Sequence, residues 1–126
     1  MFLLYLLEQD RERRDIAAGL LQEGHFISTQ VVAENINICL KKLKMSKENA
    51  FRHGALLLEA FQVLQITEHT LRLAFEISSR YQLSFWDSLI VATALENNCN
   101  MLFSEDMQDG FIIENQLKIV NPFKAK

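Results

Sequence analysis

The sequence is poor in the residues that interrupt or cross-link a chain. Its 126 residues include one proline, at position 122, four glycines and two cysteines, Cys39 and Cys99. This scarcity argues against a flexible linker, and we expect a single domain over residues 1–126. The spacing of the cysteines fits no zinc motif, and two such residues in a cytoplasmic protein are most simply free thiols.

Long apolar runs and an excess of positive charge are also missing. No apolar stretch approaches the ~18 residues of a membrane span. In MFLLYLL the positive charges follow the apolar residues, which is the reverse of a secretory signal. We therefore expect no membrane association and a cytoplasmic location. The formal net charge of −3 gives no argument for nucleic-acid binding, so any such binding has to use a local patch.

What the chain does have is apolar content, at 49% of its residues, which is enough for a core. Polar caps and apolar stripes predict helices over residues 10–24, 29–44, 46–61, 67–81 and 84–96. Short apolar runs predict strands at 25–28, 63–66, 101–104 and 117–120, and residues 1–7 fit either a helix or a strand. This alternation predicts an α/β fold with a parallel sheet covered by helices on both faces.

Three acids stand near the ends of the predicted strands. Asp106 follows strand 101–104, Asp87 lies in the first turn of the helix before that strand, and Glu34 lies in the helix after strand 25–28. Because ligands gather at the carboxyl ends of parallel strands, we expect these acids to converge. Clustered carboxylates repel unless a cation compensates, and oxygen ligands favour Mg²⁺ or Mn²⁺ over zinc. Such a metal activates water and neutralises phosphate charge, the chemistry of phosphodiester cleavage.

Each of these acids also has an ordinary structural interpretation. Asp87 can complete a capping box with Ser84, and negative charge in a first helical turn is favoured by the helix dipole. Glu34 fits a solvated helix residue, and Asp106 fits a turn that follows a strand. Spacing alone leaves both interpretations open.

The residues around the acids are equally open to two interpretations. Lys41, Lys42 and Lys44 lie in the densest basic run, KKLKMSK, and can either stabilise the end of a helix or contact RNA phosphates. Phe85 and Trp86 precede Asp87, and we expect them to pack in a core or an interface rather than stack on bases.

Three stretches carry a resemblance to a known family: ISTQVVAENINICLKKLKMS, YQLSFWDSLIVATALENNCNMLFSEDMQDG and the terminal LKIVNPF. Together they resemble a PIN-domain protein, in particular the VapC-like toxins of bacterial toxin–antitoxin pairs, from about residue 3 to residue 123. The resemblance implies a parallel sheet of about five strands and a ribonuclease that uses Mg²⁺ or Mn²⁺. It also implies an RNA substrate, a homodimer and an antitoxin partner that binds an apolar groove.

The resemblance also assigns residues to the family's metal site. Glu34, Asp87 and Asp106 match three of its four acids, and Ser104 matches the Ser or Thr two residues before the last of them. The departure is at the start, because the family opens with a strand that ends in Asp-x-Asn and no acid here precedes Glu8. The resemblance thus implies that the central first strand and the first acid are missing.

Two functional alternatives follow from this departure. One is a ribonuclease weakened by the loss of one metal ligand, and the other is a catalytically inactive PIN-like module that binds an antitoxin or RNA. For the sheet, we expect residues 1–7, or a segment exchanged with a second copy, to take the place of the missing strand. The less favoured alternative is that the two strands on either side of the missing strand pair directly, because this would force the covering helices to repack.

Overall fold

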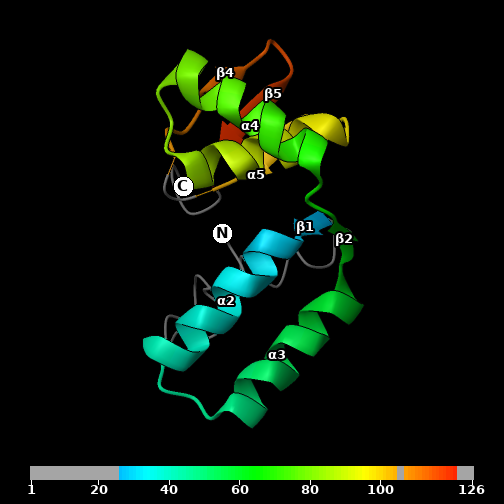
Figure 1. The fold of residues 1–126 in the computed structure, drawn as a ribbon, viewed down its shortest axis with the longest axis vertical. Helices are drawn as coiled ribbons and strands as arrows, with labels where there is room; N and C mark the ends of the chain where they lie inside the picture. The colour runs from blue at the N-terminus through cyan, green and yellow to red at the C-terminus, as the bar shows by residue number, and fades with distance from the viewer. Residues whose placement is uncertain (1–25, 105–106, 122–126) are drawn as a thin grey trace. The chain divides into compact units, whose positions relative to one another are not determined.

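Figure 1 shows the computed structural model of the chain, in which residues 26–104 and 107–121 are described. The chain divides into two compact units that meet in sequence between Leu64 and Gln65. The described part of the first unit contains β1 (Phe26–Ser28), α2 (Thr29–Lys41), α3 (Lys47–Ala60) and β2 (Gln62–Leu64). That of the second contains α4 (Glu68–Tyr81), α5 (Phe85–Glu96), β3 (Met101–Phe103), β4 (Ile112–Ile113) and β5 (Leu117–Val120).

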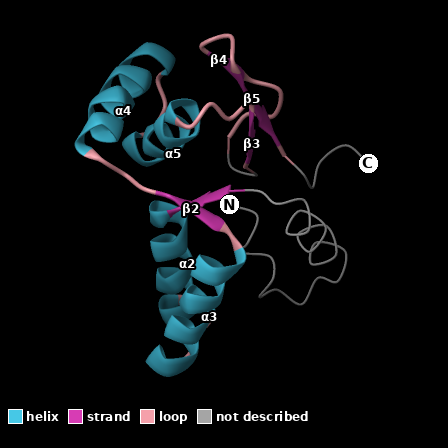
Figure 2. Cartoon of the chain, turned by 90° about the vertical axis from the view of Figure 1, so that its right-hand side faces the viewer, coloured by secondary structure: helices cyan, strands magenta, loops and turns pink. Residues whose placement is uncertain are grey.

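The first unit is a helical hairpin between two parallel strands. β1 pairs with β2 in parallel, with Ile27 opposite Val63. Helices α2 and α3 lie side by side, as both views show (Figures 1 and 2). They approach closely at Gly54, where a Cβ atom would lie 2.7 Å from Cδ1 of Ile36. A glycine is therefore needed at this crossing unless the tip of Ile36 moves.

The helices of the first unit begin where the sequence predicted. Ser28 caps α2 by accepting the Val31 amide at 3.1 Å, and Ser46 caps α3 by accepting the Asn49 amide at 3.1 Å. Helix α2 ends at Lys41, three residues before the predicted end. The reason is that Lys44 adopts a left-handed conformation, with φ of 53°, and the Met45 amide bonds back to the Cys39 carbonyl.

The second unit is built around α5. This helix is apolar on all sides, and its residues Ser88–Ala94 are all buried, as expected for a helix enclosed by a core. The core cluster joins Val91 of α5 to Ile77 of α4 and to Leu117 and Ile119 of β5. In the sheet β3–β5–β4, β5 runs parallel to β3 and antiparallel to β4.

Strand β4 is the element that the sequence did not predict. It has two residues, Ile112 and Ile113, and pairs with β5 through a tight turn in which the Gln116 amide donates to the Ile113 carbonyl. Glu114 and Asn115 both have positive φ, at 56° and 54°, as a type I′ hairpin turn requires. The usual Asn-Gly signal of such a turn is absent, which hid the hairpin.

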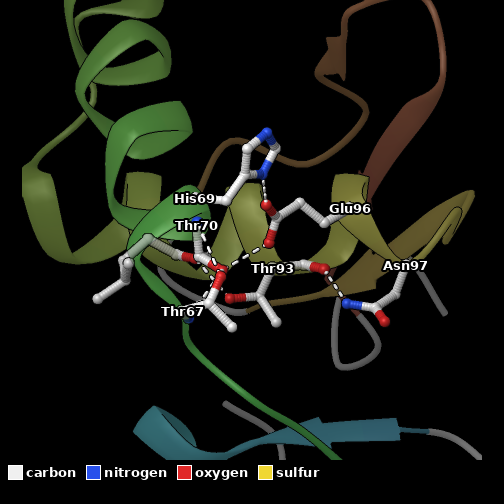
Figure 3. Close-up of polar contacts among 7 residues, drawn as sticks. Thr67, His69, Thr70, Thr93, Glu96 and Asn97 are labelled. Carbon is white, nitrogen blue, oxygen red and sulfur yellow. Dashed lines mark hydrogen bonds and ion pairs between the residues drawn. The ribbon is translucent and has the colours of Figure 1, made fainter.

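A polar cluster joins the start of α4 to the end of α5 (Figure 3). Thr67 and Thr70 form a reciprocal capping box, in which each side chain accepts the other residue's amide. The Thr70 hydroxyl also donates to Glu96 Oε1 at 2.5 Å, and His69 Nδ1 pairs with Glu96 Oε2. This side-chain cluster therefore holds the two helices in one register.

The predicted α/β class and its parallel strand pairs are confirmed by these elements. The described strands form two sheets, β1–β2 and β3–β5–β4. The helix predicted over 10–24 and the role predicted for residues 1–7 lie outside the described residues. How the place of the family's central strand is filled, and whether the chain acts as one domain, therefore stay predictions.

Candidate active site

Asp87 occupies the first turn of α5, and the helix cap leaves its carboxylate unused. Ser84 accepts the Asp87 amide at 3.1 Å, which is one half of a capping box. The other half would be a bond from the Ser84 amide to the Asp87 carboxylate. Within residues 26–104 and 107–121 that bond is not formed, in contrast to the complete box of Thr67 and Thr70. The half-buried Asp87 carboxylate thus lies at the positive end of a buried helix.

Asp106 lies outside the described residues, but the residues on either side of it are anchored. Ser104 is 3% exposed, its amide donates to the Val120 carbonyl at 3.0 Å, and its hydroxyl accepts the Met107 amide at 3.3 Å. Met107 packs in the same core cluster as Val91. Because Val91 follows Asp87 by one helical turn on the same side of α5, Met107 belongs to the core beside the helix that carries Asp87.

Glu34 lies in the other unit, on the second turn of α2, and its side chain is exposed. Gln30 Nε2 donates to Glu34 Oε2 over a long distance of 3.5 Å. Helix α2 starts directly after β1, so Glu34 stands near the carboxyl end of that strand. The convergence of Glu34 with the two aspartates stays a prediction.

The donor atoms of the predicted site suit a hard cation. Among the residues that the structure describes, no three His, Cys, Asp or Glu side chains form a group that could hold a metal. Glu34, Asp87 and Asp106 would offer carboxylate oxygens and Ser104 a hydroxyl, which favour Mg²⁺ or Mn²⁺.

The two thiols do not change this preference. Burial raises the pKa of both Cys39 and Cys99, so these thiols stay protonated at neutral pH. A protonated thiol is a poor metal ligand, because the thiolate is the form that coordinates. The chemistry of the chain's described donors thus points to oxygen ligation.

The three predicted RNA-contact lysines lie at the far end of α2 from β1. Lys41, Lys42 and Lys44 are all exposed, and Lys41 occupies the last turn of the helix, where a cation is favoured by the dipole. Glu34 precedes Lys41 by seven residues, which is about 10 Å along a helix axis. Both the structural and the phosphate-contact interpretation of these lysines remain open.

The two aromatic residues before Asp87 have different surroundings. Phe85 is partly buried against a cluster of Ala74, Leu89 and Ala92, as the sequence predicted. Trp86 is 61% exposed, so of the two predicted places, a core and an interface, the structure does not place it in a core, and the interface stays a prediction. The pairing of Glu96 with His69 and Thr70 was not predicted either, because these residues lie 27 and 26 positions apart and no local pattern links them.

None of the helices in residues 26–104 and 107–121 has the length and apolar character of a membrane span.

Comparison with known proteins agrees with this architecture. One solved structure, described as a toxin-antitoxin complex from Klebsiella pneumoniae, superposes with a TM-score of 0.71 at 21% identity, covering 98% of this chain and 94% of that one. The Mycobacterium tuberculosis toxin VapC20, described as a sarcin-ricin loop cleaving toxin, superposes with a TM-score of 0.65 at 18% identity. That match covers 83% of this chain and 86% of VapC20.

Sequence comparison gives the family. No curated protein matches the chain significantly. A family model described as the PIN domain matches residues 2–109, which include parts of both units and all of Glu34, Asp87, Ser104 and Asp106. With most of its length matched, the chain belongs to the PIN-domain family.

Proposed function

We propose that this PIN-domain protein is a metal-dependent ribonuclease toxin of a toxin–antitoxin pair. The observation that carries the proposal is the position of Asp87, half-buried at the start of a buried helix, with a carboxylate that its own helix cap does not use. A negative charge placed there without a described partner suits a cation ligand. The toxin descriptions of the two structural neighbours support the same assignment.

The residues take distinct roles in this proposal. Asp87 and Asp106 hold Mg²⁺ or Mn²⁺, and Glu34 supports a second ion or orients the attacking water. Ser104, whose hydroxyl accepts the Met107 amide, fixes the segment that carries Asp106. The bound metal supplies an activated water and neutralises charge on the phosphate that is cut.

The lysines act on the rest of the RNA backbone in this proposal. Lys41, Lys42 and Lys44 are exposed and lie about 10 Å or more from Glu34 along α2. At that separation they contact phosphates that neighbour the cleaved bond rather than the cleaved phosphate itself. Their charges would then raise the affinity for RNA and make it dependent on salt concentration.

The proposed protein partners are an antitoxin and a second copy of the chain. Large apolar side chains on α3, including Phe51, Leu56 and Leu58, are more than half exposed, as at surfaces that meet another protein. The proposed place of action is the cytoplasm, where a bacterial toxin meets its RNA.

Cleavage of a mixed RNA substrate in Mn²⁺ tests the proposal. We expect products in Mn²⁺, none in EDTA, and none with Asp87→Asn, which removes a ligand charge while keeping the side-chain shape. Glu68→Gln is the matched control, because Glu68 is also an acid in a first helical turn but is exposed and paired with Arg72. Binding of Mn²⁺, followed by electron paramagnetic resonance, should weaken with Asp87→Asn and not with Glu68→Gln.

Two results would contradict the proposal. Cleavage that survives both EDTA and Asp87→Asn would exclude Asp87 and the metal from the reaction. RNA or antitoxin binding without cleavage, in a folded protein that carries Mn²⁺, would favour the inactive module instead.

A further inference from the structure

Two hydrogen-bonded stretches follow each other directly between β3 and β4. In the first, the Met107 amide donates to the Ser104 hydroxyl at 3.3 Å. In the second, the Phe111 amide donates to the Gln108 carbonyl at 3.3 Å, and Gly110 has a φ of 85°. A type II turn requires a positive φ at its third residue, which glycine adopts without strain. Because no residue separates the two stretches, a displacement of this turn is passed on to the first stretch.

The turn is bonded to the end of β5 by a side chain as well as by the backbone. Asp109 Oδ1 accepts the amide of Asn121, the residue that follows the strand, at 2.7 Å. The Gly110 amide donates to the Ile119 carbonyl at 2.7 Å, and the Ile119 amide donates to the Phe111 carbonyl at 2.9 Å. The Asp109 carboxylate therefore continues the bonding of this turn to β5 past the last residue of the strand.

The first stretch is bonded to β5 from the other side. Ser104 follows β3, and its amide donates to the Val120 carbonyl at 3.0 Å. Because β5 lies between β3 and β4, Ser104 and Asp109 bind its end from opposite sides. Met107 adds an attachment to the core, where it packs in the cluster that contains Val91. The end of β5 thus holds both stretches in place.

These attachments surround the position of Asp106 in the chain. Ser104 stands two residues before it, and Met107 follows it directly. In the proposed function Asp106 is a metal ligand. Mg²⁺ demands a near-ideal octahedral arrangement of its ligands, and residues that orient a ligand affect metal affinity strongly. A bond that fixes the neighbouring turn therefore bears on the metal site.

A direct role for Asp109 as a metal ligand is the alternative. The side chain is exposed, but its Oδ1 atom accepts a short bond from a backbone amide. The amide oxygen of an asparagine accepts such a bond as well as a carboxylate oxygen does, whereas a carboxylate ligand also supplies charge to the cation. The observed bond favours a role in positioning, and asparagine at this place separates the two roles.

We propose that Asp109 is a positioning residue of the ribonuclease, which fixes the segment that carries Asp106 to the end of β5 through the Asn121 amide. The inference rests on the proposed function for the role of Asp106. Asp109 acts through the turn closed by Gln108 and Phe111, and it contributes the position of its oxygen rather than its charge.

Two substitutions of Asp109 test the inference, because Asp109→Ala removes the acceptor and Asp109→Asn keeps it. We expect Asp109→Ala to weaken Mn²⁺ binding by the full chain about tenfold, and Asp109→Asn to retain nearly the affinity of the unmodified chain. Electron paramagnetic resonance during a Mn²⁺ titration measures the affinity. Hydrogen exchange measured by NMR should show a less protected Asn121 amide in Asp109→Ala than in Asp109→Asn.

Glu114→Ala is the matched control for a general loss of stability. The Glu114 carboxylate also holds a turn beside β5, through the Tyr81 hydroxyl and the Arg80 guanidinium, but that turn follows β4. Glu114→Ala should lower the melting temperature and leave Mn²⁺ affinity unchanged. If Asp109→Ala fails to fold by circular dichroism, Asp109→Glu takes its place. It keeps the charge but moves the acceptor by one methylene, and it should weaken Mn²⁺ binding as well.

Two results would overturn the inference. Equal Mn²⁺ affinity of Asp109→Ala and the unmodified chain would show that the metal site does not need this bond. A loss in Asp109→Asn as large as that in Asp109→Ala would show that the charge matters, as in a ligand.

The substitution Asp87→Asn keeps this inference apart from the proposed function. If Asp87→Asn weakens Mn²⁺ binding and Asp109→Ala does not, the proposed metal site stands and only the positioning role of Asp109 is lost. An unmodified chain that binds no Mn²⁺ would instead contradict the proposed function, and the inference with it.

Discussion

Single residues of the second unit secure the unpredicted hairpin. Glu114 holds a left-handed φ of 56°, which is unfavourable for a residue with a side chain. Its carboxylate accepts the Tyr81 hydroxyl at 2.8 Å and pairs with Arg80, and its amide donates to the Tyr81 oxygen at 3.0 Å. These bonds hold the strained turn against the end of α4.

The ion pair makes a pH-dependent contribution to stability. The Arg80 guanidinium and the Tyr81 hydroxyl lower the pKa of Glu114 below its usual value. A lowered carboxyl pKa stabilises the fold above the unfolded pKa, and this stability is lost as pH falls through the folded pKa. We expect Arg80→Gln to raise the pKa of Glu114 towards its usual value, as measured by NMR titration. The free energy of unfolding should then fall less steeply as pH drops through the carboxyl range. An unchanged Glu114 pKa in that variant would show that the pair does not persist in solution.

His53 on α3 contributes pH dependence of a different origin. Its Nε2 atom is buried without a hydrogen-bond partner, and burial lowers the pKa of the ring below 6.5. The neutral ring stabilises the first unit above the unfolded pKa, and this stability falls as pH drops through the folded pKa. Thermal melts between pH 7 and 5 should therefore show a loss of stability that His53→Phe reduces, whereas a variant of the exposed His69 should retain the loss. Equal loss in all three proteins would assign the effect to other groups.

At the scale of elements, the sequence predicted what short-range bonds decide. Ser28, Ser46, Thr67 and Ser84 each cap the helix predicted for them, because a cap is a contact over three residues. The end of α2 was predicted too late, since the left-handed turn at Lys44 carries no glycine signal. Strand β4 is shorter than any periodic pattern, so only its pairing with β5 reveals it.

The candidate site could not be predicted from short-range patterns alone. Glu34, Asp87 and Asp106 stood near predicted strand ends, but caps and turns explain such acids equally well. The resemblance to PIN-domain proteins favoured the metal site over the structural interpretation. The structure adds that the Ser84 cap leaves the Asp87 carboxylate unused. Contacts between distant residues, such as Thr70 with Glu96, have no local signal and needed the folded chain.

The polar cluster that joins α4 to α5 can be tested by substitution of Thr70. Thr70→Val keeps the shape of the fully buried side chain but removes the hydroxyl that serves the Thr67 amide and Glu96. Leaving such groups without partners costs about 1–3 kcal/mol, which urea denaturation would measure. The control is Thr93→Val, whose buried hydroxyl donates only to the Leu89 carbonyl of its own helix and should matter less. An equal decrease in the free energy of unfolding for the two variants would mean that the hydrogen bonds between α4 and α5 add nothing beyond packing.

At the scale of the whole molecule, the predicted site draws on both units. Glu34 belongs to the unit of α2 and α3, while Asp87 and Asp106 belong to the unit of α4 and α5. The PIN-domain match includes residues of both units. A cation held by Glu34, Asp87 and Asp106, as proposed, would bind the folded chain only, and its stabilisation would rise with the logarithm of the cation concentration once that exceeds the dissociation constant.

The number of acids around that cation sets the last prediction. Mg²⁺ takes few protein ligands and holds several waters, so each carboxylate matters to its affinity. We expect a 126-residue polypeptide with this sequence to cleave RNA weakly, and the same polypeptide extended by a family-type strand ending in Asp-x-Asn to bind Mn²⁺ and cleave RNA at least about tenfold better. An extension that ends in Ala-x-Asn separates the two contributions of such a strand. It should raise the melting temperature by pairing backbone groups but leave Mn²⁺ affinity low. Equal and strong cleavage by the extended and unextended chains, abolished in both by Asp87→Ala, would show that Glu34, Asp87 and Asp106 suffice without a fourth acid.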